Sequence, residues 1–108
     1  MSRPFPLLNI EPEATGSRTV LLVAGEVDLA TAPQLRAAID AALVSGAREV
    51  CVDFSETTFM DSSGLHALVA ATHRAAAVGC ELTLVCPPGP VARVIELSGV
   101  GELIPRMS

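Results

Sequence analysis

The order of apolar and polar residues divides the chain into short segments, each with the spacing of a strand or of a helix. Runs rich in Val, Leu and Ile that end at Gly or Pro are typical of strands, whereas apolar residues that recur every three or four positions are typical of helices. The pattern predicts the order β-β-α-β-α-β-α, followed by at most a short terminal strand. The strands are predicted at 7–11, 19–24, 49–54 and 82–86, the helices between residues 31 and 46, 62 and 79, and 90 and 99, and the terminal strand within 100–105.

The connections between these segments predict a single sheet. The turn-rich stretch 12–17 joins the first two strands, which indicates an antiparallel hairpin. A strand, a crossover helix and the next strand of one sheet run parallel, so the second, third and fourth strands are predicted to point the same way. The fold class is therefore α/β, with one mixed, mostly parallel sheet of four to five strands and helices packed on it.

Composition and charge restrict the classes of function. A chain of 108 residues suits one domain, in which residues 1–6 are expected to be flexible, and an apolar content of 50% excludes broad disorder. The net charge is -5, the arginines are scattered singly, and neither Trp nor Tyr is present to stack on bases. Nucleic acid is therefore not expected as a ligand.

The same composition predicts a location in the cell. The longest apolar runs, at 20–24 and 67–71, are far shorter than the roughly 20 residues that span a bilayer. The first residues include two prolines and no continuous apolar segment typical of a secretory signal. Cys51, Cys80 and Cys86 are odd in number and form no C-x-x-C pair, which suits thiols in a reducing compartment. We therefore expect a cytoplasmic protein without a membrane partner.

Acidic side chains are predicted to gather at one edge of the sheet. The carboxyl ends of the parallel strands share this edge, where open α/β sheets usually carry their functional sites. Glu26 and Asp28 are thereby expected near the segment 61–63. Thr31 and Gln34, at the start of the first helix, have the spacing of a capping box. The loops predicted to meet at this edge are 25–30, 55–62 and 87–89.

The segment Asp61-Ser62-Ser63-Gly64 is the most informative part of the chain. It opens the second helix, where its side chains can cap backbone N–H groups at the positive end of the helix dipole. Capping does not explain Gly64, because glycine in a first turn costs about 0.5 to 1 kcal/mol relative to alanine. A bare backbone there indicates that another group approaches closely. A phosphate on a serine here would add about -1.5 to -2 charge at a helix end that tolerates it.

Two segments carry a family resemblance, GEVDLATAPQL at 25–35 and FMDSSGL at 59–65. They resemble the STAS-domain anti-sigma factor antagonists of bacteria, and the resemblance extends from about Leu7 through Ile104 in the family's order of elements. It implies that Ser63, with Ser62 as the alternative, is phosphorylated by an anti-sigma factor that is itself a serine kinase. It also implies that only the unphosphorylated form binds this partner and frees the sigma factor, and that a serine phosphatase reverses the modification.

The resemblance further implies where the partner binds. Asp28 and Asp61 match family positions associated with partner contact and with the phosphorylation reaction. The chain is accordingly expected to be a regulator and not an enzyme, without cofactor or metal. The residues expected at the partner-binding site are Glu26, Asp28, Thr31, Met60, Asp61, Ser62, Ser63 and Gly64.

Electrostatic repulsion is the switching mechanism that the sequence suggests. Ser63 is predicted on an edge that holds Glu26, Asp28 and Asp61. No arginine lies in the flanking loops, and the nearest one downstream, Arg74, is about three turns along the same helix. We therefore expect no internal ion pair to a phosphate on Ser63, and we expect the added negative charge to weaken partner binding.

Other functions fit the residues less well. A serine hydrolase would need G-x-S-x-G around Ser63, which is absent, and His66 lies one turn away on the same helix. His66 and His73 are two turns apart, about 10.5 Å, which is too far for one metal ion. A nucleotide site would need a Walker A or G-x-G-x-x-G motif, and neither is present. The open alternative is another STAS role, as a subunit of a signalling scaffold or as a partner of a membrane transporter.

Overall fold

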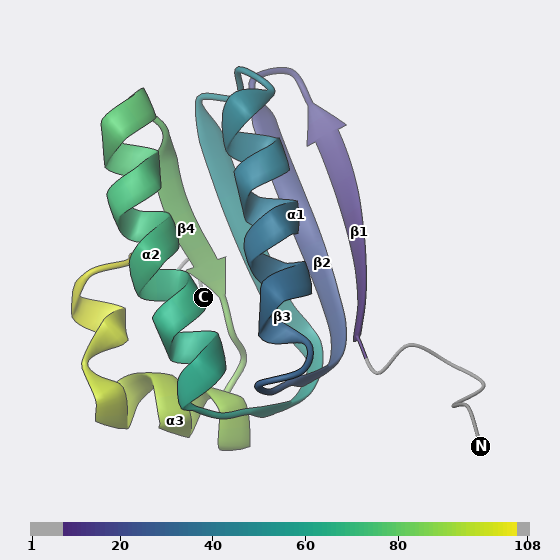
Figure 1. The fold of residues 1–108 in the computed structure, drawn as a ribbon, viewed down its shortest axis with the longest axis vertical. Helices are drawn as coiled ribbons and strands as arrows, with labels where there is room; N and C mark the ends of the chain where they lie inside the picture. Colours follow the sequence, from purple (N-terminus) through teal and green to yellow (C-terminus); the bar gives the residue numbers. More distant parts are fainter. Residues whose placement is uncertain (1–7, 106–108) are drawn as a thin grey trace.

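A computed structural model describes residues 8–105, in which strands and helices follow the predicted order (Figure 1). Residues 1–6, which were expected to be flexible, and Leu7 lie outside the described residues. The strands in this part of the chain form one four-stranded sheet. The elements are β1 (Leu8–Thr15), β2 (Arg18–Val27), α1 (Ala32–Val44), β3 (Glu49–Met60), α2 (Ser62–Val78), β4 (Glu81–Val85), α3 (Pro90–Ser98) and the 3₁₀-helix η1 (Val100–Glu102).

The strands have the predicted directions. β1 pairs antiparallel with β2, and β2, β3 and β4 are parallel neighbours in the order β1-β2-β3-β4. α1 and α2 lie side by side in front of the sheet in Figure 1, and α3 packs against β3. The predicted α/β fold with a mixed, mostly parallel sheet is therefore confirmed.

Apolar side chains between the helices and the sheet form one core. Val50, Val52 and Phe54 alternate along β3 and are at most 1% exposed, and Leu35 and Ile39 of α1 are fully buried. Burial of a side chain of this size contributes about 1.5 to 3 kcal/mol to folding. This core fixes the positions of the first turns of α1 and α2 relative to the ends of the strands.

β2 and β3 extend further toward the carboxyl edge than predicted. They end at Val27 and Met60, whereas the sequence predicted ends at residues 24 and 54. Twice in this stretch β3 carries one more residue than β2 between paired positions. Such bulges break the alternation of apolar and polar residues from which a strand is recognised. The loop predicted at 55–62 is therefore mostly strand.

The first strand and the C-terminal segment also differ from the prediction. β1 continues to Thr15, so only Gly16 and Ser17 remain of the turn predicted at 12–17. The terminal strand predicted within 100–105 is wrong, because a 3₁₀-helix occupies its first half. The chain then returns to the sheet, where the backbone N–H of Leu84 donates to the carbonyl of Pro105 at 2.9 Å.

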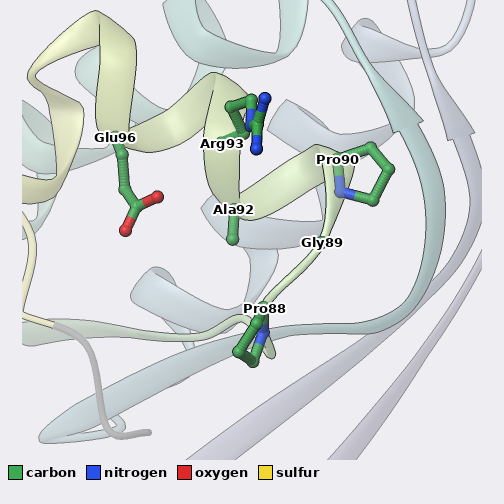
Figure 2. A pocket seen from close by; sticks show the side chains of 6 residues that line it. All are labelled: Pro88, Gly89, Pro90, Ala92, Arg93 and Glu96. Atoms are coloured by element: carbon green, nitrogen blue, oxygen red, sulfur yellow. The ribbon is translucent and has the colours of Figure 1, made fainter.

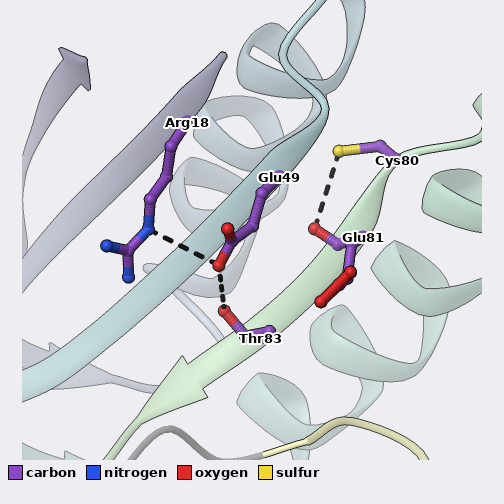
Figure 3. A network of polar contacts seen from close by, with 5 residues as sticks. All are labelled: Arg18, Glu49, Cys80, Glu81 and Thr83. Carbon is purple, nitrogen blue, oxygen red and sulfur yellow. Dashed lines mark hydrogen bonds and ion pairs between the residues drawn. The ribbon is translucent and has the colours of Figure 1, made fainter. Parts of the chain in front are cut away.

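A polar network joins three strands at the amino ends of the parallel strands (Figure 3). Arg18 Nε of β2 lies 3.4 Å from Glu49 Oε2 of β3, and the hydroxyl of Thr83 in β4 donates to the same oxygen at 3.4 Å. Arg18 Nε makes no aligned hydrogen bond, so this contact is an ion pair only. Both side chains are partly exposed, so the pair contributes about 1 kcal/mol or less.

The cysteines are structural. All three are buried, and none forms a disulfide, as predicted. Burial raises the pKa of the Cys80 thiol, and the neighbouring carboxylates of Glu49 and Glu81 act in the same direction, whereas a backbone hydrogen bond with Val50 opposes them. Its Sγ lies 3.7 Å from the carbonyl of Glu81, to which it donates (Figure 3). The thiol of Cys80 is therefore protonated near neutral pH and is a poor nucleophile.

Candidate functional site

The loops after β2 and β3 meet at the carboxyl edge of the sheet, as the strand directions predicted. Val27 and Met60 are paired as the last residues of the two strands, and the backbone N–H of Asp61 donates to the carbonyl of Val27 at 3.2 Å. Asp28 and Asp61 thus follow neighbouring strand ends. The third loop predicted at this edge, 87–89, lies with α3 around a separate surface cavity of about 510 Å³ (Figure 2).

Asp61 caps the first turn of α2. Its Oδ1 accepts the backbone N–H of Ser63 at 2.8 Å, and its carbonyl accepts that of Gly64 at 3.1 Å. Ser62 is exposed and Ser63 is half-buried. Neither hydroxyl makes a hydrogen bond to another residue within 8–105, so the cap leaves both hydroxyls available for modification.

Gly64 is buried, and its close neighbours belong to the protein itself. A Cβ atom at this position would lie 2.8 Å from Met60 Cγ and 2.8 Å from Val27 Cγ1. The missing side chain lets the first turn of α2 pack directly on the ends of β2 and β3. The predicted close approach to Gly64 is therefore present, but it is internal and does not require an external group.

A hydrogen-bonded turn fixes the loop between β2 and α1. Asp28 Oδ1 accepts the backbone N–H groups of Ala30 at 2.9 Å and Thr31 at 3.0 Å. The Thr31 hydroxyl donates to the carbonyl of Glu26 at 2.7 Å and accepts the N–H of Asp28 at 2.9 Å. These bonds hold the loop rigidly, with Asp28 half-buried and Glu26 exposed.

The capping box predicted from Thr31 and Gln34 is wrong. Thr31 is the N-cap residue of α1, but its side chain makes no capping hydrogen bond because its hydroxyl turns back toward β2. The side-chain amide of Gln34 donates instead to the carbonyl of Leu8 at 3.0 Å. Gln34 therefore ties α1 to the edge strand β1, and Asp28 satisfies backbone N–H groups before the helix.

A shallow cavity of about 220 Å³ lies between the first turns of α1 and α2. Ser63 and His66 line it from α2, and Leu29 and Arg36 line it from the loop and from α1. The expectation that no internal ion pair forms with a phosphate on Ser63 did not take this arginine into account. That expectation covered only the flanking loops and the helix that contains Ser63, whereas Arg36 belongs to the neighbouring helix α1.

Two exposed apolar residues at this edge escaped the sequence analysis. Leu29 is 80% exposed on the rigid loop, and Phe59 is 47% exposed near the end of β3. Leu29 could have been predicted from the sequence, because it is an apolar residue in a loop beside the predicted site. By contrast, Met60 and Thr31 are only 3% and 8% exposed, so these two predicted binding residues can act only by positioning others.

Metal-ligand clusters and membrane-spanning helices are both absent from the described residues. Within residues 8–105, no group of three or more His, Cys, Asp and Glu side chains is arranged to hold a metal ion. His66 and His73 are both exposed on α2. No helix in the described range is long and apolar enough to cross a bilayer.

The chain is similar to known proteins over most of its length. The family profile described as "Mlab, STAS domain" matches residues 10–105. The anti-sigma-B factor antagonist of Listeria monocytogenes is 31% identical over 84 residues, which cover 78% of this chain and 74% of that protein. An anti-sigma factor antagonist from Mycobacterium paratuberculosis superposes with a TM-score of 0.85 at 27% identity, covering 98% of this chain and 89% of that structure.

The structure of a third relative is known in a phosphorylated form. The phosphorylated form of the Bacillus cell fate determinant SpoIIAA superposes with a TM-score of 0.67 at 29% identity, covering 94% of this chain and 91% of that structure. The chain belongs to the STAS domain family. The relatives from Listeria and Mycobacterium and SpoIIAA are anti-sigma factor antagonists, which are regulators and not enzymes.

Proposed function

We propose that this chain is an anti-sigma factor antagonist that works by partner switching. Unphosphorylated, it binds an anti-sigma factor with serine kinase activity and thereby frees the sigma factor that this partner holds. The partner phosphorylates Ser63, which ends the binding, and a serine phosphatase restores the binding form. The names of the relatives support this proposal, as does the existence of SpoIIAA in unphosphorylated and phosphorylated forms.

The observation that carries the proposal is the surface around Ser63. Its hydroxyl is without a hydrogen bond in the described part of the chain, and it lies in the same cavity as the exposed Leu29. Asp28 and Asp61 use their carboxylates to hold the two adjoining segments through backbone N–H groups. An apolar anchor on a rigid loop beside a modifiable hydroxyl suits a docking surface whose affinity the hydroxyl controls. Ser62 lies outside this cavity's lining, which favours Ser63.

Phosphate transfer tests the proposal directly. The chain is incubated with the anti-sigma factor kinase of the same organism and Mg-ATP, and phosphate is counted by intact-protein mass spectrometry. We expect one phosphate on the wild type and on Ser62→Ala, and none on Ser63→Ala. Equal phosphorylation of wild type and Ser63→Ala would contradict the assignment. A scaffold subunit would instead co-purify in a large assembly and gain no phosphate.

Leu29→Ala is expected to weaken binding of the anti-sigma factor by about tenfold to 100-fold, because an anchoring leucine contributes about 1.5 to 3 kcal/mol when it is buried. The substitution should change the free energy of unfolding by less than about 0.5 kcal/mol, since the side chain is 80% exposed in the unbound chain. Isothermal titration calorimetry measures the affinity, and thermal unfolding measures the stability.

The matched control is Leu97→Ala, which removes the same side chain at 82% exposure from α3. Its affinity for the anti-sigma factor should equal that of the wild type. If the two leucine variants bind equally well, Leu29 is not an anchor and the docking surface lies elsewhere.

A further inference from the structure

We propose that Arg36 of α1 binds the phosphate of phosphorylated Ser63, so that the modified serine forms an internal ion pair across the groove between α1 and α2. The inference rests on the proposed phosphorylation of Ser63 and concerns how the modified state is held. Its starting point is that Arg36 and Ser63 line the same cavity, of about 220 Å³, from opposite helices.

Arg36 is available for a new anion. It is exposed, and no ion pair links it to a carboxylate within residues 8–105. Asp40, one turn further along α1, is paired with Arg74 of α2 at 3.3 Å. This second pair shows that an arginine on one helix reaches an anion on the other across the same groove.

Helix geometry brings the guanidinium toward the serine. Side chains of a helix lean toward its N-terminus, so Arg36 extends toward the first turn of α1, the end at which the cavity lies. On the other wall, His66 is three residues after Ser63 and therefore on the same face of α2. A planar guanidinium can donate two parallel hydrogen bonds to a phosphate, which a neutral side chain cannot replace.

The nearby carboxylates would make a cation beside a phosphate on Ser63 favourable. Asp61 Oδ1 accepts the N–H of Ser63, and Asp28 Oδ1 accepts the N–H groups of Ala30 and Thr31. Both carboxylates are thus engaged by the backbone, yet their negative charge would repel a phosphate. Arg36 supplies the opposite charge from α1.

Pairing of Arg36 with the phosphate would increase the difference in partner affinity between the unmodified and phosphorylated forms. In the unmodified chain, the guanidinium is exposed at the edge that carries Leu29 and can contact an acidic group of the partner. In the phosphorylated chain, the guanidinium would be held by the phosphate. One modification would then add a negative group and withdraw a positive one from the same surface.

A pH titration followed by ³¹P NMR tests the ion pair without kinase or partner. The chain is prepared with phosphoserine at position 63 by incorporation during synthesis. The second ionisation of a free phosphoserine has its midpoint near pH 6. A neighbouring guanidinium favours the dianion, so the midpoint should fall by about half a pH unit or more. In Arg36→Gln the midpoint should return to about pH 6.

Two further variants isolate the effect of Arg36. Arg48→Gln removes the same charge from the opposite edge, before β3, and should leave the midpoint unchanged. The titration is repeated in a His66→Gln background, because histidine side chains ionise in the same pH range. The shift between arginine and glutamine at position 36 should persist there.

The outcomes separate this inference from the proposed function. Equal midpoints for the wild type and Arg36→Gln would overturn the ion pair, while repulsion by the acidic edge would still account for switching. A wild type that the kinase fails to modify on Ser63 would contradict the proposed function, whatever the midpoints of the synthetic phosphoprotein are.

Discussion

Ser63→Glu is expected to weaken binding of the anti-sigma factor about 100-fold, because like charges facing each other across an interface cost several kcal/mol and each 1.4 kcal/mol is tenfold. The surface that receives the new charge already carries the exposed Glu26 and the half-buried Asp28 and Asp61. A phosphoserine at position 63 carries more charge than glutamate and should weaken binding further. Calorimetric titration of each form with the partner measures the loss.

Ser63→Gln is the matched control, since glutamine has the size of glutamate without its charge. We expect glutamine to retain most of the affinity, and we expect the difference between the two variants to shrink as salt is raised, because salt screens exposed charges. If Ser63→Glu and phosphoserine 63 both bind the partner as tightly as the wild type, the electrostatic switch is refuted. An equal loss with glutamine would show that bulk, and not charge, blocks the partner.

Gly64→Ala is expected to destabilise the fold by about 1 to 2 kcal/mol. The new Cβ would lie 2.8 Å from both Met60 Cγ and Val27 Cγ1. Such overpacking costs about 1 to 3 kcal/mol, and the better helix propensity of alanine recovers up to about 1 kcal/mol. In a domain of this size, each 1 kcal/mol lowers the Tm by about 4 to 8 °C, which differential scanning calorimetry resolves.

Two variants test the physical reason for this loss. Gly101→Ala is the control, because its Cβ would meet only Ile95 Cγ2 at an ordinary 3.9 Å, and it should change the stability by less than about 0.5 kcal/mol. Val27→Ala removes the Cγ1 atom in question, so Gly64→Ala should cost less in that background than in the wild type. A purely additive pair of substitutions would show that contact with Val27 is not the cause.

The directions of the strands could be predicted from the sequence, but the ends of β2 and β3 could not. A crossover helix returns the chain to the starting end of the sheet, so the two strands that it joins run parallel, and this inference needs only the order of elements. The carboxyl half of β3 follows no regular alternation, because bulges place extra residues opposite β2. A loop is therefore predicted from the sequence for such a strand, because the bulges become apparent only when the partner strand is known.

The site was predictable to the extent that topology determines it. Asp28 and Asp61 follow parallel strands, so their proximity could be inferred although 32 residues lie between them in the sequence. That Arg36 and Ser63 line the same cavity depends on how α1 and α2 pack against each other, which no motif in either helix encodes. The same holds for Gln34, whose amide bonds to β1 although its spacing from Thr31 is that of a capping box.

Both borders of the sheet carry features that disfavour the addition of a further strand. The outer border of β1 presents the exposed Glu11, Pro12 and Glu13, and charged residues and proline discourage another chain from adding a strand. At the other border, the carbonyl of Pro105 already occupies the N–H of Leu84. These features disfavour the continuous backbone ladder of an augmented sheet and favour contact with a partner through side chains and loop ends. A contact without such a ladder breaks with fewer backbone hydrogen bonds lost, which suits the reversible binding that we propose for this chain.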